Sequence, residues 1–190
     1  MTEISSDIVL RAQEGDEAAT RAVIEAFQGP VLSTVSRFLG VRHRGEVEDI
    51  AEEVFLKIFR SIRHFDGANG SFTAWVYSVV RDYCFEMLKR RATAPSQHPR
   101  ERYEHANSKG GDLQPHQDFD NLELCRRIEE ALGTLSEDQR MAFVLREYER
   151  LGYAEIASIT GVHEGVVKSR LARAKASLHQ QLRPYLESDA

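Results

Sequence analysis

The chain has 190 residues, of which 42% are hydrophobic and 29% charged, which allows one domain or two small ones with real hydrophobic cores. It contains no apolar run long enough to span a bilayer, and its first residues lack the pattern of a signal peptide, so we expect a cytoplasmic protein with no membrane span. The formal net charge of -5 argues against a free-standing DNA-binding protein, because such proteins usually carry a basic surface.

Helical spacing of apolar residues runs through most of the chain, without sustained alternation of β-branched residues, and predicts an all-α fold. In the N-terminal block, residues 1–91, Ser6 and Asp7 can cap a first helix and Asp16 a second. Gly29 and Pro30 are expected to interrupt the second helix, because proline lacks the backbone N–H that a helix interior uses. The apolar positions of these helices are Ile8, Val9, Ala12, Ala19, Val23, Ile24, Phe27, Val31, Leu32, Val35, Phe38 and Leu39.

Residues 47–62 form the clearest amphipathic helix of the sequence. Asp49, Glu52 and Glu53 are three and four residues apart, so they share one face, and Leu56 follows one turn later. That face is either a solvated surface with a local pair between Glu53 and Lys57, or an acidic rim that attracts a basic partner.

A loop bounded by Gly67 and Gly70 precedes the last helix of this block, which ends in three consecutive basic residues. Asn69 with Gly70 is either an ordinary turn or part of a pocket that captures an unstacked base. Trp75 repeats at helical spacing with Phe72 and Val79, so we expect it in the core.

Residues 92–118 are rich in proline, glycine and polar side chains, and we expect them to form a flexible linker because they cannot bury enough apolar surface to fold. His98, His105 and His116 lie there, and a metal site among them is not favoured. Cys84 and Cys125 are expected to be reduced and buried, although a redox pair stays open.

The C-terminal block, residues 119–190, carries the pattern of a helix-turn-helix. Ser136 can cap one helix, residues 153–159 form a short helix, and Gly161 stands where the following turn needs a positive φ. In the next helix Val167, Leu171 and Ala174 can face inward.

The second helix of such a motif enters the major groove of DNA. Residues 162–183 hold five Lys or Arg against one acid, Glu164, and the basic ones are Lys168, Arg170, Arg173, Lys175 and Arg183. With Ser169, the first three can contact bases or phosphates. The alternative is a solvated basic face on an ordinary helical hairpin.

Four segments of this block closely resemble the fourth domain of bacterial sigma factors of the sigma-70 family: LGTLSEDQR at 132–140, FVLR at 143–146, GYAEIA at 152–157 and GVVKSRLARA at 165–174. In that family this helix-turn-helix binds the promoter's −35 element. The resemblance assigns duplex −35 contacts to Lys168, Ser169, Arg170, Arg173 and Arg146. Val166 stands where the family usually has threonine.

The N-terminal block resembles the second sigma domain, through EDIAEEVF at 48–55, FTAWVY at 72–77 and the basic residues 89–91. The resemblance implies that Asp49, Glu52, Glu53, Phe55 and Leu56 bind core RNA polymerase. It implies that residues 65–72 open the −10 element, with the single strand held by Asn69, Ser71, Arg81, Lys89, Arg90 and Arg91. Glu52, Asp82 and Glu86 depart from the family pattern.

The domain between these two in larger sigma factors is missing, as in the small extracytoplasmic-function group. The resemblance therefore implies a sigma factor that binds core RNA polymerase and recognises duplex −35 and single-stranded −10 promoter DNA. It also implies an anti-sigma factor that holds the two domains shut. No cofactor, metal or catalytic residue is expected. The alternatives are a stand-alone helix-turn-helix regulator with an N-terminal sensing or dimerisation domain, and an enzyme built on the N-terminal block.

Overall fold

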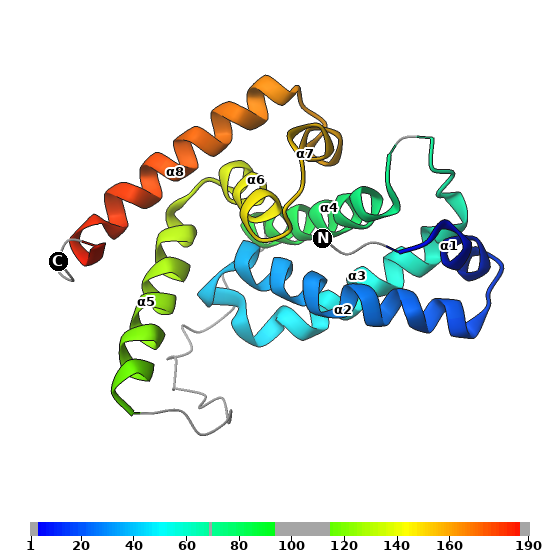
Figure 1. Cartoon of the computed structure of the whole chain (residues 1–190), viewed down its shortest axis with the longest axis horizontal. Helices are drawn as coiled ribbons and strands as arrows, with labels where there is room; N and C mark the ends of the chain where they lie inside the picture. The colour runs from blue at the N-terminus through cyan, green and yellow to red at the C-terminus, as the bar shows by residue number, and fades with distance from the viewer. Residues whose placement is uncertain (1–3, 69, 94–114, 187–190) are drawn as a thin grey trace.

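The computed structural model of the chain describes residues 4–68, 70–93 and 115–186, and every regular element in these ranges is helical (Figure 1). The N-terminal block contains α1 (Ser6–Gln13), α2 (Glu17–Leu39), α3 (Val47–Ser61) and α4 (Phe72–Thr93), with short 3-10 helices η1 (Val41–Glu46) and η2 (Ile62–His64). The C-terminal block contains α5 (Pro115–Thr134), α6 (Glu137–Glu147), α7 (Tyr153–Thr160) and α8 (Glu164–Leu186). The all-α prediction is confirmed for the described residues.

Helix caps explain where several of these elements begin. Asp16 and Ser136 cap α2 and α6 as predicted, and the amide of Ala19 donates to Asp16 Oδ1 at 2.8 Å. The first helix is capped by Ser5 rather than by Ser6 or Asp7, since Ser5 has extended backbone angles and accepts from the amide of Ile8 at 3.4 Å. The prediction for this helix was therefore one residue late.

Helix α2 continues without a break through Gly29 and Pro30, so the predicted interruption was wrong. A proline removes one helical hydrogen bond, and the exposed or half-buried side of a helix tolerates that loss best. Gly29 is exposed and Pro30 is half-buried. The opposite face is fully buried at Val23, Phe27, Val31 and Val35, and its packing keeps both halves in one helix.

The largest hydrophobic core is continuous between the two blocks. It begins at Val9, includes the buried faces of α2, α3 and α4, and extends to Leu171 in α8. Helix α4 packs against α7, and α2 packs against α6 and α5 (Figure 1). A smaller cluster joins α5 to α8 around Leu132 and Leu178. The predicted blocks are therefore in direct contact.

Two side chains, those of Trp75 and Cys125, differ from the burial expected of them. Trp75 is only half-buried, in an aromatic cluster with Phe65 and Phe72 at centroid distances of 5.5 and 5.4 Å. Cys84 is buried and Cys125 is exposed, and both are free thiols. The expectation of two buried thiols was thus right for Cys84 alone, and its burial raises the pKa of that thiol to about 12.

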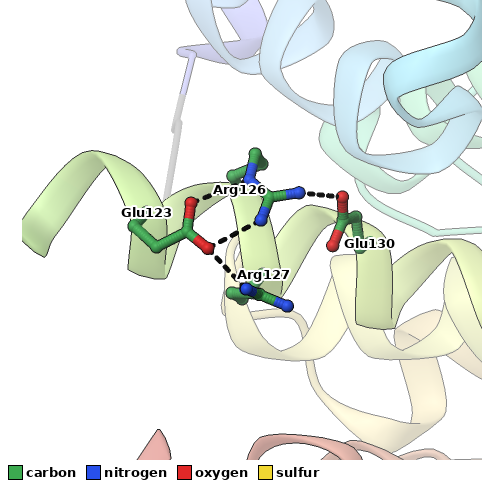
Figure 2. A network of polar contacts seen from close by, with 4 residues as sticks. All are labelled: Glu123, Arg126, Arg127 and Glu130. Carbon is green, nitrogen blue, oxygen red and sulfur yellow. Dashed lines mark hydrogen bonds and ion pairs between the residues drawn. The ribbon is translucent and has the colours of Figure 1, made fainter.

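The exposed face of α5 carries a network of ion pairs (Figure 2). Glu123 accepts from Arg126 and from Arg127, each at 2.6 Å, and Arg126 also pairs with Glu130. These residues are three and four apart, the spacing at which side chains meet on a helix. The two guanidinium groups lower the pKa of Glu123 to about 2.

Candidate nucleic-acid interface

Helices α7 and α8 form a helix-turn-helix with the turn that the sequence predicted. Gly161 has φ 65° and ψ 31°, the left-handed conformation that glycine adopts without steric cost. Val167, Leu171 and Ala174 face inward, each 5% exposed or less. Their burial fixes the rotation of α8, so the residues between them point outward.

The outward face of α8 presents Lys168, Ser169 and Arg173, all exposed. Arg170 differs from them because its Nη2 donates to Asp138 Oδ2 on α6 at 2.7 Å, and its side chain is only 19% exposed. The structure thus brings three of the predicted residues together on one surface and ties the fourth to α6.

Arg146, predicted with this set, supports the motif from within. Its Nη1 donates to the carbonyl oxygen of Leu151 at 2.7 Å, and its guanidinium lies 4.8 Å from the ring centroid of Tyr153. Lys168 Nζ lies 5.4 Å from the same centroid. Tyr153 is therefore an exposed aromatic ring with two cations near it, a feature missed in the sequence although the tyrosine opens the first helix of the motif.

The face of α3 predicted from its acidic spacing is open to solvent. Asp49, Glu52 and Glu53 are exposed, and Leu56 is 47% exposed. Phe55 is half-buried and stacks on Phe59 at 6.3 Å. Acidic groups around an exposed leucine suit a basic partner that also buries apolar surface.

Lys57 does not use the local partner considered in the sequence. Its Nζ lies 2.8 Å from Glu86 Oε2 on α4, in place of an ion pair with Glu53. Glu86 also accepts from Arg90 at 2.6 Å, and these two cations, Lys57 first, lower the pKa of the Glu86 carboxyl. The ion pair between Lys57 and Glu86 connects α3 with α4.

The loop at residues 65–72 is held closed at its base. Gln13 Nε2 donates to the carbonyl oxygens of Ile62 at 2.9 Å and Phe65 at 2.5 Å. The rings of Phe65 and Phe72 meet edge to face at 5.2 Å. Nothing in the sequence around Gln13 indicated this role, because its partners follow 49 and 52 residues later.

Two polar residues of this loop were predicted to bind a base, and one of them, Asn69, lies outside the described residues. The other, Ser71, accepts through its Oγ from the amide of Ala74 at 3.1 Å, so its hydroxyl supports the first turn of α4. Asp66 Oδ1 accepts from the amide of Ala68 at 2.9 Å and shapes the turn between them.

Two of the predicted cations of α4, Arg81 and Arg90, lie close to acids. Arg81 Nε donates to Asp82 Oδ1 at 2.8 Å, and Arg90 is paired with Glu86. Lys89 is exposed, and the side chain of Arg91 lies outside the described residues. Asp82 and Glu86, two departures from the family pattern, therefore neutralise part of the positive charge on this helix.

Neither a metal centre nor a membrane span is found in the part of the chain that the structure describes. No group of three or more His, Cys, Asp or Glu side chains there is arranged to hold a metal ion. None of the helices in the described ranges is long and apolar enough to cross a bilayer. His98 and His105 lie outside those ranges, and the side chain of His116, which belongs to α5, is not among the described side chains.

Comparison with known proteins gives matches over both blocks. The family described as Sigma-70 region 2 matches residues 23–93, and Sigma-70, region 4 matches residues 125–178. The ECF RNA polymerase sigma-E factor of Escherichia coli (strain K12) is 31% identical over 193 residues, which cover 98% of this chain and 99% of that protein.

Two solved structures share the fold. The sigma factor RpoE of Bartonella quintana, crystallised with the anti-sigma factor NepR, has a TM-score of 0.68 at 19% identity over 86% of this chain and 96% of that one. CnrH in complex with the cytosolic domain of CnrY has a TM-score of 0.66 at 20% identity over 97% of both chains.

Proposed function

This chain belongs to the sigma-70 family, in its extracytoplasmic-function group, and from that premise we propose how its surfaces divide the work of promoter recognition. It is a sigma factor for promoter recognition, and the alternative of a stand-alone regulator is not favoured. The observation that best supports this assignment of surfaces is the helix-turn-helix. Its buried residues fix the rotation of α8 so that a basic face points outward.

The −35 element is bound as duplex by α8. Lys168, Ser169 and Arg173 are exposed side by side and contact base edges or phosphates in the major groove. Arg170 also contacts the DNA after it releases Asp138, and Arg146 is the fifth residue of this DNA-binding set. Tyr153 adds an aromatic edge beside Lys168.

Core RNA polymerase is bound by α3. Asp49, Glu52 and Glu53 steer a basic polymerase surface towards the helix, and Leu56 with Phe55 supplies the apolar area buried in the complex. The opposite face of α3 is buried in the core, so this face is presented by a rigid element.

The −10 element is held as a single strand at residues 65–72. A flipped base enters the loop and meets Asn69 and Ser71, while Arg81, Lys89, Arg90 and Arg91 hold the phosphates. The closed base of the loop supports this role, because a preformed pocket loses less conformational entropy on binding.

The division of the chain follows the same assignments. Residues 1–91 form the polymerase and −10 domain, 92–118 the linker and 119–190 the −35 domain, and the ends of the linker extend into α4, which ends at Thr93, and α5, which begins at Pro115. The protein acts in the cytoplasm, needs no cofactor and catalyses no covalent step. An anti-sigma factor regulates it, as the complex of RpoE with NepR suggests for a protein of the same fold.

Transcription in vitro with core RNA polymerase on a library of genomic fragments tests this function. We expect discrete transcripts whose start sites share two upstream elements, and none from core polymerase alone. Transcripts that are identical with and without the protein would contradict the proposal.

A further inference from the structure

One side chain at the start of α8 is aliphatic and yet open to solvent. Val166 is the third residue of the helix and is 43% exposed, whereas its neighbour Val167 is fully buried. Among the described residues, Val166 belongs to neither hydrophobic cluster of the molecule. The packing of the free chain therefore does not explain why a branched aliphatic residue stands there.

Helical spacing places Val166 in line with polar residues that are proposed to bind DNA. Ser169 and Arg173 follow it by three and seven residues, spacings that keep side chains on one side of a helix, and both are exposed. Because the buried Val167 and Leu171 fix the rotation of α8, this row points to solvent. Val166 is its N-terminal end, the part of a recognition helix that meets base edges.

The first turn of α8 holds Val166 in a fixed position. Its amide donates to the carbonyl oxygen of His163 at 2.9 Å, and the amide of Val167 donates to the same oxygen at 3.2 Å. A valine in a helix has one strongly preferred side-chain rotamer, because its Cβ is branched. Its two methyl groups therefore have one orientation, and little conformational entropy is lost when a complex buries them.

Open space lies next to Val166, at Gly165. This glycine is exposed, its φ is not positive, and a Cβ atom placed on it would meet no other part of the chain within 4 Å. Glycine is unfavourable inside a helix, so neither helix formation nor packing accounts for it here. A position without a side chain lets a base edge come close to the valine.

The chemistry of valine discriminates among the four bases. In the major groove guanine, adenine and cytosine present hydrogen-bonding groups, and thymine alone also presents a methyl group. The side chain of Val166 has neither donor nor acceptor, so against the other bases it would displace water from polar groups without replacing the hydrogen bonds. Against a thymine methyl group it buries apolar surface on both partners.

We propose that Val166 is a specificity-determining residue of α8, which contacts the 5-methyl group of one thymine in the −35 element. The inference rests on the proposed function, because it takes α8 to lie in the major groove. It adds one apolar contact to the polar contacts of Lys168, Ser169 and Arg173. The −35 element of this chain therefore contains a thymine at the position that meets the first turn of α8.

The test removes the methyl group from the DNA. Transcription in vitro selects a promoter that the full chain uses with core RNA polymerase. Each thymine of its −35 element, on either strand, is then replaced in turn by deoxyuridine, which lacks only the 5-methyl group. At one position the wild-type complex should bind about fourfold more weakly in gel shifts at fixed salt, since burial of one methyl group contributes about that factor.

Val166→Ala completes a double-mutant cycle with the same DNAs. It removes both methyl groups of the side chain, and alanine is the better helix former. The ratio of the affinities for thymine and deoxyuridine DNA should fall from about four to about one, while core polymerase binding and circular dichroism stay unchanged. Leu10→Ala, which shortens an exposed aliphatic side chain on α1, is the matched control and should keep the ratio at about four.

Two results would overturn the inference. One is a wild-type complex that loses no affinity at any thymine position, a measurement that needs no folded variant. The other is a methyl effect that persists undiminished in Val166→Ala. A chain that selects no promoter with core polymerase would instead contradict the proposed function, so the two failures are distinguishable.

Discussion

At the scale of single residues, Gln13 shows how one amide can shape a distant loop. It donates to two carbonyl oxygens, at the start of η2 and at the start of the 65–72 loop. A glutamine is suited to this because its NH₂ group offers two donors. The loop is thus positioned by a residue of α1 that does not belong to it.

Gln13→Leu should lower the free energy of unfolding by about 1–3 kcal/mol, because the carbonyl oxygen of Phe65 would lose the donor that Gln13 supplies and that of Ile62 would keep only the amide of Phe65, at 3.1 Å. It should also slow opening of a duplex promoter more than binding of a pre-melted one. Chemical denaturation and permanganate footprinting measure the two effects. Gln28→Leu, an exposed position on α2, is the control and should change neither.

The two cysteines should react very differently with iodoacetamide. Cys125 is exposed and should be alkylated in the native protein near neutral pH, whereas Cys84 is buried with its pKa raised to about 12. Since the thiolate is the nucleophile, Cys84 should stay unmodified until the chain is denatured. Peptide mass spectrometry gives the result, and equal labelling of both thiols in the native state would contradict it.

At the scale of elements, α8 combines a buried face that fixes its rotation with an exposed basic face. Arg170→Ala with Arg173→Ala should weaken binding to the −35 element by about 1–3 kcal/mol for each arginine that reads a base. Core polymerase binding should survive, because α3 lies in the other block. Gel shifts with core polymerase measure the first and fluorescence titration the second, and a parallel decrease in both would argue against separate modules.

Helix α5 offers a test of electrostatics by pH. The ion pairs of Glu123 lower its pKa from about 4.5 in the unfolded chain to about 2 in the folded one (Figure 2). Their contribution to folding stability is therefore fully present above pH 4.5 and is lost as the pH falls towards 2. The Glu123 carboxylate should titrate in NMR with a midpoint near 2. Arg126→Gln should move that midpoint towards 4.5, and an unchanged midpoint would rule out the ion pair as its cause.

At the scale of the whole molecule, the net charge of -5 governs binding to DNA. The long-range field of an acidic chain opposes that of the phosphates, so the protein alone should bind promoter DNA weakly. Gel shifts with and without core polymerase measure this. Tight and specific binding by the protein alone would favour a stand-alone regulator.

Local patterns in the sequence predicted much of the fold but could not predict contacts between residues far apart in the chain. The caps Asp16 and Ser136 and the turn at Gly161 depend on neighbours within a few residues, and all three are confirmed. The continuity of α2 past Pro30 depends on packing along its buried face, which a local breaker rule does not include.

The same limit applies to the candidate site. The outward face of α8 was predictable because helical periodicity separates it from the buried face. The pairing of Lys57 with Glu86 and the hydrogen bond from Thr34 to Glu149 were not predictable, since 29 and 115 residues separate the partners. Such partners are chosen by tertiary folding, and no periodicity in the sequence encodes them.

The continuous core has a consequence for the life of the protein in a crowded cell. When the two blocks separate, the apolar residues that form the core between them become exposed to solvent. Exposed apolar surface of this kind promotes aggregation and proteolysis. The turnover and solubility of the protein should therefore depend on the supply of polymerase. Copies in excess of polymerase survive only while their two blocks stay in contact.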